Sequence, residues 1–257
     1  MWTREWIEVN GVRSSRFAVH YLQTPSLFAD VRLPIQRPAF AHATSFADLT
    51  DDELLLLAKQ RGFTGRVTAV GDTITWQHEI DFQPPDGTPD IGRVRRIGPT
   101  QMYEHALDSS YVESWQSVAS GDDAFLVVRV ERAGRLDQIL LVAGDYFLYV
   151  RNRSADLPVA RSLDSLIVAT HASRAQIIAY LDCEFSTGRV RAGSVPWEIQ
   201  ASTLPWREGH QLAFANAIAL LPDSVHLSVR VSSAERWVVP TNTLPKDVLV
   251  ALFPAAR

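Results

Sequence analysis

Three segments of the chain carry titratable and aromatic side chains at every second position, the spacing that puts them on one face of a β-strand. Within them, His78 stands among apolar neighbours and Glu113 stands between two aromatic residues. A carboxyl group in an apolar interior has a raised pKa unless a cation pairs with it, and such groups are frequent at functional sites. The three faces are Ile74, Trp76, His78, Ile80 and Phe82; Tyr103, His105 and Leu107; and Tyr111, Glu113 and Trp115.

We expect these faces to line the interior of a barrel and to contact a bound molecule there. Ligand pockets are largely apolar and contain a few placed polar groups, which is the mixture that the three faces offer. The alternation in Leu27–Leu33 adds Arg32 on the face opposite to the leucines. The predicted ligand-binding residues are Arg32, Trp76, His78, Tyr103, His105, Tyr111, Glu113 and Trp115.

Each of the two most polar candidates also has a purely structural interpretation. His78 would be a buried neutral imidazole with a hydrogen-bond partner, or else a polar anchor in a ligand cavity. Glu113 would form an internal salt bridge, with Arg32 as a candidate partner, or else act as a functional carboxylate. The sequence leaves both choices open.

The sequence offers no recognisable catalytic, metal or cofactor motif, and we predict none of the three. The seven histidines are dispersed without metal-ligand spacing, and neither a nucleophile elbow nor a glycine-rich phosphate loop occurs. Cys183 lies between Asp182 and Glu184, whose charges disfavour a reactive thiolate.

The composition narrows the class of protein. The 257 residues carry a net charge of −4 with both signs interspersed, so we do not expect nucleic acid as a partner. A lone cysteine is typical of a reducing compartment. No segment has the roughly 20 apolar residues that cross a bilayer, and the charged N-terminal residues do not form a signal peptide. We therefore expect a cytoplasmic protein with no membrane span.

The three faces belong to a succession of short predicted strands separated by tight turns such as Gly71-Asp72, Gly98-Pro99 and Gly121-Asp122. Such short connections make neighbouring strands antiparallel, and closure into a barrel removes the exposed edges. One helix is predicted between strands, with a capping box at Thr50 and Glu53 and a stop at Gly62. The predicted fold is all-β with a few short helices, an up-and-down barrel like that of lipocalins.

We predict two domains and find no clear internal repeat. Residues 1–153 would form the barrel. Residues 154–257 lack regular alternation at first and then regain strand-like segments, so they would form an α+β extension. That extension would either complete the first barrel or build a smaller second one.

Several short motifs spread over most of the chain resemble those of one family. They are Gln23–Pro34, Gln60–Gly65, Trp76 with Ile80–Pro85, Asp90–Gly92, Tyr111–Glu113 with Trp115, Asp182–Glu184, and Trp197 with Ser202–Gly209. Together they resemble bacterial relatives of the fungal Hri-type family, which is built from lipocalin-like barrel modules. The resemblance implies the fold; it carries no activity and no catalytic residues.

Three functions are compatible with these observations. The leading hypothesis is a non-enzymatic barrel that binds a small apolar or amphipathic molecule. Bulky inward residues would instead fill the barrel and favour an interaction module, with a protein partner or a second copy of the chain. In that case Trp206 and Arg207 are candidates for the contact surface, unless Trp206 plugs a barrel end. The third hypothesis is an enzyme that uses His78, His105 and Glu113 on a lipophilic substrate.

Overall fold

The computed structural model describes residues 1–118, 124–192, 195–214, 218–220, 227–229 and 235–253. Half of the chain is in strands, 50%, and 16% is in helices. The prediction of an all-β protein with a few short helices is confirmed. The turn expected at Gly121-Asp122 lies outside the described residues.

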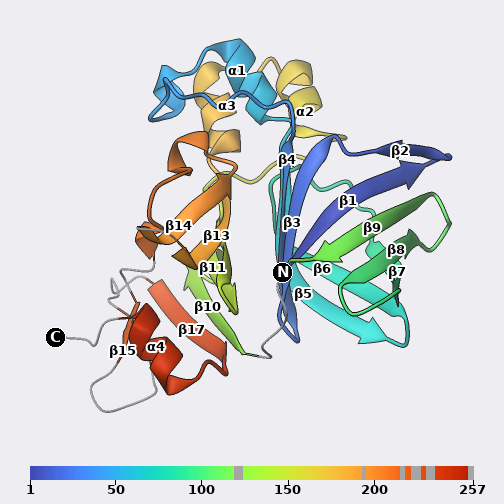
Figure 1. The fold of residues 1–257 in the computed structure, drawn as a ribbon. Helices are drawn as coiled ribbons and strands as arrows, with labels where there is room; N and C mark the ends of the chain where they lie inside the picture. Colours follow the sequence, from blue (N-terminus) through green and yellow to red (C-terminus); the bar gives the residue numbers. More distant parts are fainter. Residues whose placement is uncertain (119–123, 193–194, 215–217, 221–226, 230–234, 254–257) are drawn as a thin grey trace.

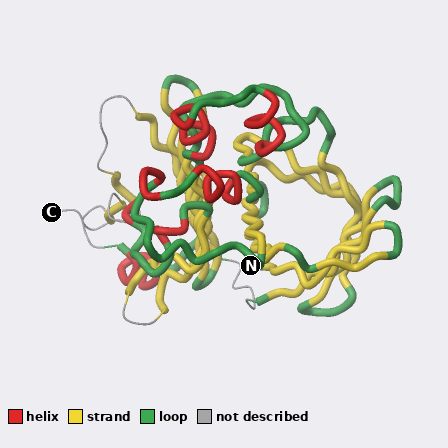
Figure 2. The backbone as a smooth tube through the Cα atoms, turned by 90° about the horizontal axis from the view of Figure 1, so that it is seen from above, coloured by secondary structure: helices red, strands yellow, loops and turns green. Residues whose placement is uncertain are grey.

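The chain up to Ser117 forms a closed, eight-stranded antiparallel barrel (Figure 1). Each strand pairs with the next along the chain, and β1 pairs with β9 to close the ring, which Figure 2 shows from above. The barrel strands are β1 (Trp2–Val9), β3 (Phe17–Gln23), β4 (Leu27–Pro34), β5 (Arg61–Val70), β6 (Thr73–Asp81), β7 (Asp90–Arg96), β8 (Gln101–Ala106) and β9 (Tyr111–Ser117).

Several short elements lie outside the wall of the barrel. Strand β2 (Val12–Ser14) forms a hairpin with β1, and the single turn η1 (Phe46–Asp48) precedes helix α1 (Asp51–Leu57). Thr50 and Glu53 form the predicted capping box of α1. Gly62 does not end this helix as predicted, because it already lies in β5. A Cβ there would come within 2.7 Å of the Phe185 ring, so the position requires glycine for packing.

The rest of the described chain forms a second antiparallel sheet with the order β14-β13-β12-β11-β10-β17. The barrel closes without any C-terminal strand, so these strands do not complete it. The pairing changes between Ser117 and Phe125, whereas the domain division at residue 153 remains a prediction. The elements are β10 (Phe125–Arg132), β11 (Arg135–Ala143), β12 (Tyr146–Arg151), α2 (Leu163–Ala169), α3 (Arg174–Leu181), β13 (Glu184–Ala192), β14 (Val195–Ser202), η2 (Pro205–Arg207), the pair β15 (Ile218–Leu220) and β16 (Leu227–Val229), β17 (Glu235–Asn242) and α4 (Lys246–Leu252).

The second sheet repeats the strand order of the barrel. The chain order and pairing of β10, β11, β12, β13, β14 and β17 match those of β1, β3, β4, β5, β6 and β9, and the pair β15–β16 matches β7–β8. Helices precede β13 as they precede β5. The two halves of the chain therefore repeat one topology, and this repeat was not visible in the sequence.

The two halves even share a β-bulge at the same place. Both registers shift between a threonine and a glycine, Thr64-Gly65 in β5 and Thr187-Gly188 in β13. In each case the threonine hydroxyl donates to a phenylalanine carbonyl on the preceding strand, Phe28 at 2.6 Å or Phe147 at 2.8 Å. A Cβ on either glycine would lie 1.9 Å from a backbone oxygen, so only glycine fits.

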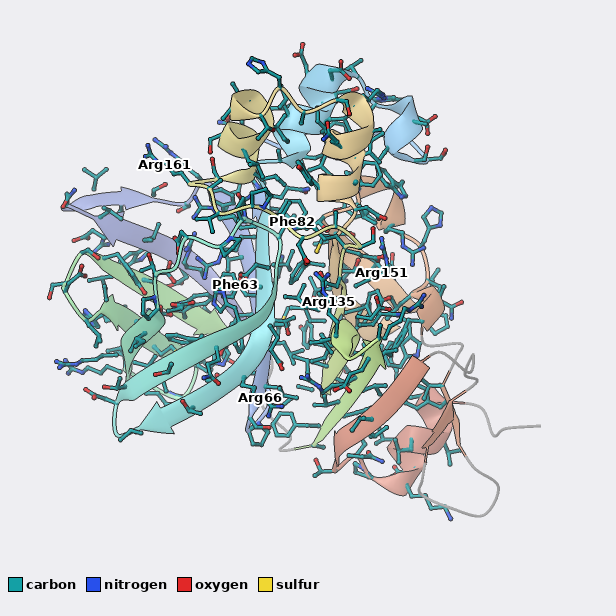
Figure 3. All side chains as sticks on the ribbon, turned by 180° about the vertical axis from the view of Figure 1, so that it is seen from behind. Phe63, Arg66, Phe82, Arg135, Arg151 and Arg161 are labelled. Carbon is teal, nitrogen blue, oxygen red and sulfur yellow. The ribbon has the colours of Figure 1, made fainter. Side chains whose placement is uncertain are left out.

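One hydrophobic core joins the halves along the outer face of β3 and β4 (Figures 1 and 2). Leu27, Ala29, Val31 and Leu33 point away from the barrel interior and pack against the second sheet. Figure 3 shows Phe82 between barrel and sheet, and Trp206 packs edge-on against Phe46 at the periphery of this core rather than in a barrel end. The opposite face of β4 is thereby left to line the barrel interior.

Candidate functional site

The barrel encloses a cavity of about 1950 Å³ that extends between its two ends. Each of the eight barrel strands contributes lining residues, and Phe63, visible in Figure 3, is one of them. The cavity opens beside the loop Gln83–Pro89 at one end and beside Pro99 and Thr100 at the other. A hollow interior of this size is rare for a barrel whose inward residues are bulky, because small barrels are commonly filled by their own side chains.

One part of the wall is aromatic. The Trp76 indole N–H donates to the Tyr21 hydroxyl at 2.9 Å, and Tyr21 donates onward to Gln23 Oε1 at 2.6 Å. The ring of Trp115 lies 5.8 Å from that of Tyr21. These contacts fix large flat rings in place and leave them in contact with the cavity.

A second part of the wall holds buried ion pairs. Arg32 Nε donates to Asp30 Oδ1 at 2.8 Å, and its Nη1 lies 3.8 Å from Glu113 Oε1. Arg4 pairs with the same oxygen of Glu113. All four groups come from inward positions of β1, β4 and β9, which the closure of the barrel brings together. Burial raises the pKa of Asp30, although Arg32 opposes the shift.

Three buried polar atoms beside this cluster have no hydrogen-bond partner. They are Asp30 Oδ2, Glu113 Oε2 and Trp115 Nε1. Buried polar atoms are nearly always paired in folded proteins, so these three atoms distinguish this part of the wall from an ordinary protein core.

Glu104 is the most perturbed acid in the cavity wall. Its Oε1 accepts a hydrogen bond from the Tyr111 hydroxyl at 2.9 Å. Burial and the neighbouring charge of Glu113 raise the pKa of Glu104 to about 8. At neutral pH this carboxyl group therefore carries a proton.

His78 lies closer to one end, between two acids. Its ring stacks on Phe63 with centroids 4.4 Å apart, and its nitrogens lie 2.7 Å from Asp81 Oδ1 and 3.0 Å from Asp90 Oδ2. Burial alone would lower the pKa of His78, but the two aspartates outweigh it and raise the pKa to about 9. The imidazole is thus protonated at neutral pH, and the expectation of a neutral buried ring is wrong.

The mouths of the cavity carry further charges. Arg61 and Arg161 line the end beside the Gln83–Pro89 loop, where Figure 3 shows Arg161 above the barrel. Arg96 lines the other end, with its guanidinium 5.5 Å from the Trp2 ring. Burial, Arg32 and Arg4 lower the pKa of Arg61.

Most of the residues predicted from sequence do line the cavity, but two do not. Arg32, Trp76, His78, Tyr111, Glu113 and Trp115 line it. Tyr103 and His105 lie on the other face of β8, because Met102, Glu104 and Ala106 are its inward residues. The Tyr103 ring instead lies 5.9 Å from that of Trp6. The set of His78, His105 and Glu113 proposed for catalysis is therefore not assembled.

The face predicted for β6 is also divided. Ile74, Trp76 and His78 point inward, but the register shifts before Ile80, which pairs with Thr64. Ile80 and Phe82 consequently lie in the core between barrel and sheet. A β-bulge moves all later residues of the strand to the opposite face, and the alternation of residue types in the sequence does not reveal it.

Sequence reasoning missed Arg4, Asp30 and Glu104 as members of the site. The signal for Glu104 was present in the β8–β9 hairpin, whose register pairs Glu104 with Glu113 and His105 with Val112. Residues paired across strands share a face, so an inward Glu113 implies an inward Glu104. The same pairing excludes an inward His105.

Two of the motifs that carry the family resemblance, Gln60–Gly65 and Ser202–Gly209, meet around Arg37 in a buried polar network that joins the halves. Arg37 Nη1 donates to Gln60 Oε1 at 2.7 Å and to the Ser202 carbonyl at 2.6 Å. Gln60 Nε2 donates to the Thr203 carbonyl at 2.9 Å, and Arg37 also pairs with Glu208. These motif residues therefore have structural roles outside the cavity.

Comparisons with family models, with curated proteins and with solved structures gave no match. The relationship to the Hri-type family stays a prediction. In the described part of the chain, no group of His, Cys, Asp or Glu side chains is placed to hold a metal ion. Within the same residues, no helix has the length and apolarity needed to span a bilayer.

Proposed function

We propose that this protein is a lipocalin-like, non-enzymatic barrel that binds a small amphipathic molecule in its interior. The observation that carries the proposal is the cavity of about 1950 Å³, which exceeds the roughly 300–1,000 Å³ of most ligand pockets. A cytoplasmic location and kinship with the Hri-type proteins belong to the same proposal.

The chemistry of the wall supports an amphipathic occupant. Trp76, Trp115 and Phe63 offer apolar surface, while Arg32 and Glu104 offer charge and hydrogen bonds in the same cavity. A purely apolar molecule would leave the orphaned atoms of Asp30 and Glu113 buried without partners, which costs free energy. A purely polar molecule would leave the aromatic wall unused.

The alternative of a solid barrel that functions through its surface is not favoured, because the interior is hollow. The bulky inward residues in the sequence had favoured a barrel filled by its own side chains. Bulk alone does not fill a barrel when neighbouring side chains form ion pairs along the wall, as Arg4 and Arg32 do with Glu113 and Asp30.

A cavity-filling variant tests the proposal. Val94 is inward on β7 and lines the cavity, so Val94→Trp should occupy part of it. Val70→Trp is the matched control, because Val70 is 82% exposed on the outside. Binding of 1-pyrenemethanol would be measured by energy transfer from tryptophan to pyrene, alongside native mass spectrometry of the purified wild-type protein.

We expect the wild type and Val70→Trp to bind the probe alike and Val94→Trp to bind at least about tenfold more weakly. An excess mass that is lost on denaturation would identify a carried ligand. Equal binding by all three proteins, or no binding by the wild type, would refute the binding barrel.

A further inference from the structure

The charges inside the barrel do not balance. Five carboxyl groups line the described interior, against the cations of Arg4, Arg32 and the protonated His78. At the mouths, the charges of Arg61, Arg96 and Arg161 are nearly offset by Asp86 and Asp108. Because Glu104 carries a proton at neutral pH, four of the five are charged, and Glu104 is an interior acid that forms no ion pair with any described cation. The five are Asp30, Asp81, Asp90, Glu104 and Glu113.

Two of these acids face each other directly. Glu104 and Glu113 are register partners on β8 and β9, and both side chains point inward. Like charges opposite each other on one face of a sheet are destabilising. Among the described residues, Tyr111 is the only hydrogen-bond donor to Glu104, and Glu113 Oε2 has none. Glu113 pairs with Arg4 and Arg32 through Oε1, whereas no described cation forms an ion pair with Glu104.

An aromatic surface lies next to the same acids. A Cβ on Gly92 would come within 3.3 Å of both the Trp76 ring and the Glu104 side chain, so the ring and the carboxyl group flank this glycine. The Trp76 ring and the Glu104 side chain, which both line the cavity, are thereby held next to each other. A carboxylate beside an aromatic face is the arrangement that attracts an organic cation.

We propose that the molecule held in the barrel is a lipophilic amine, whose ammonium group lies between Glu104 and Glu113 and whose apolar body contacts the Trp76 wall. This proposal rests on the proposed binding function and adds the chemical class of the ligand. The ammonium supplies Glu104 with a cationic partner and Glu113 Oε2 with a hydrogen-bond donor. A neutral alcohol supplies only the donor, and a carboxylic acid adds a further negative charge.

Binding of an amine must then be linked to the proton on Glu104. The free protein holds that proton because the pKa of Glu104 is about 8, and an ammonium ion beside the carboxyl group expels it. Amine affinity therefore rises from about pH 6 to about pH 8, because removing the proton from Glu104 costs less free energy as the pH increases. The charged groups that face Glu104 are Glu113 and Tyr111 on β9, Asp90 on β7 and Arg32 on β4.

The test compares three probes with one skeleton: 1-pyrenemethylamine, 1-pyrenemethanol and 1-pyrenecarboxylic acid. We expect the wild type at neutral pH to bind the amine about tenfold more tightly than the alcohol, and the acid most weakly. In Glu104→Gln the advantage of the amine and its pH dependence should disappear, while alcohol binding stays unchanged. Glu8→Gln is the matched control, because Glu8 pairs with Arg13 on the exterior.

The outcomes separate the two proposals. If the alcohol and the amine bind equally well and Val94→Trp weakens both, the barrel binds ligands but the amine inference is wrong. If no probe binds the wild type, the binding function itself fails. Titration calorimetry of the wild type in two buffers of different ionisation enthalpy is independent of any variant. Proton release with the amine alone supports the inference, and its absence contradicts it.

Discussion

The two halves of the molecule share a strand order but differ in what they enclose. The barrel holds a cavity, whereas the inner face of the second sheet packs against its own hydrophobic side chains. Trp76 and Trp197 occupy matching positions, opposite Val67 and Val190. Trp76 borders the cavity, but Trp197 lies 5.4 Å from the Phe253 ring at the end of α4. The same scaffold is thus either hollow or filled.

The difference arises at a few matched positions. Asp30 and Arg32 of the barrel correspond by register to Tyr149 and Arg151 of the second sheet. Tyr149 is buried and belongs to the hydrophobic cluster there, while Asp30 is a buried charge beside the cavity. Helix α4 adds leucines on the inner face of the second sheet. Buried charge together with the absence of such a covering helix keeps the barrel open.

The largest loss of stability is expected at the glycines of the repeated bulge. Substituting them tests whether the bulge is equally essential in both halves. Gly65→Ala and Gly188→Ala should each destabilise the protein by about 4 kcal/mol or more, because the new Cβ would overlap a backbone oxygen. Gly98→Ala is the control, since nothing lies near its Cβ. Urea unfolding measures all three. A mild effect in one half only would break the equivalence of the bulges.

The matched tryptophans sharpen the contrast between hollow and filled. Trp197→Ala should cost about 3–5 kcal/mol, because it creates a new cavity in a packed core. Trp76→Ala should cost less, about 1–3 kcal/mol, because a cavity already adjoins the ring. Losses of equal size in urea unfolding would argue that the barrel interior is as well packed as the second sheet.

The matched arginines test the contribution of buried charge. Arg32→Met should cost about 2–3 kcal/mol, because it leaves the fully buried Asp30 without its cation. Arg151→Met should cost less than about 1 kcal/mol, because its nearer partner Asp182 is 46% exposed and its second partner, the buried Glu184, keeps Arg207. The comparison requires only the difference in unfolding free energy between each variant and the wild type. The reverse order would contradict a charged interior.

The last test concerns a pH dependence that Glu104 confers. Its pKa rises from 4.5 to about 8 on folding, so between these values the folded protein holds a proton that the unfolded chain has lost. Stability therefore falls as pH rises through this window, by at most about 1.4 kcal/mol per pH unit. Glu104→Gln should flatten the profile of unfolding free energy between about pH 5 and pH 8. An unchanged profile would show that Glu104 does not titrate there.

Much of the barrel could be predicted from sequence because its turns are short and its strands alternate. The hairpin register of β8 and β9 could also have placed Glu104 inside and His105 outside, since both follow from the length of one turn. The bulge before Ile80 could not have been placed, because it depends on a backbone contact between Gly65 and Gln77.

The second sheet was harder to predict because its strands are buried on both faces. Strands β10 and β11 read as continuous apolar runs, which indicates burial but not the partner. The repeat left only a short trace, Thr-Gly-Arg-Val at residues 64–67 and again at 187–190. Four shared residues were too few to reveal that six strand pairings recur.

The burial of β4 on both of its faces constrains how this protein can evolve. One face of β4 holds the core against the second sheet and the other lines the cavity, so substitutions there alter stability and the cavity wall together. Strands β7 and β8 have several outward residues in contact with solvent, which leaves their inward residues free to vary separately. The shape and charge of the cavity should therefore evolve mainly through the solvent-facing side of the barrel, opposite the wall that the two halves share.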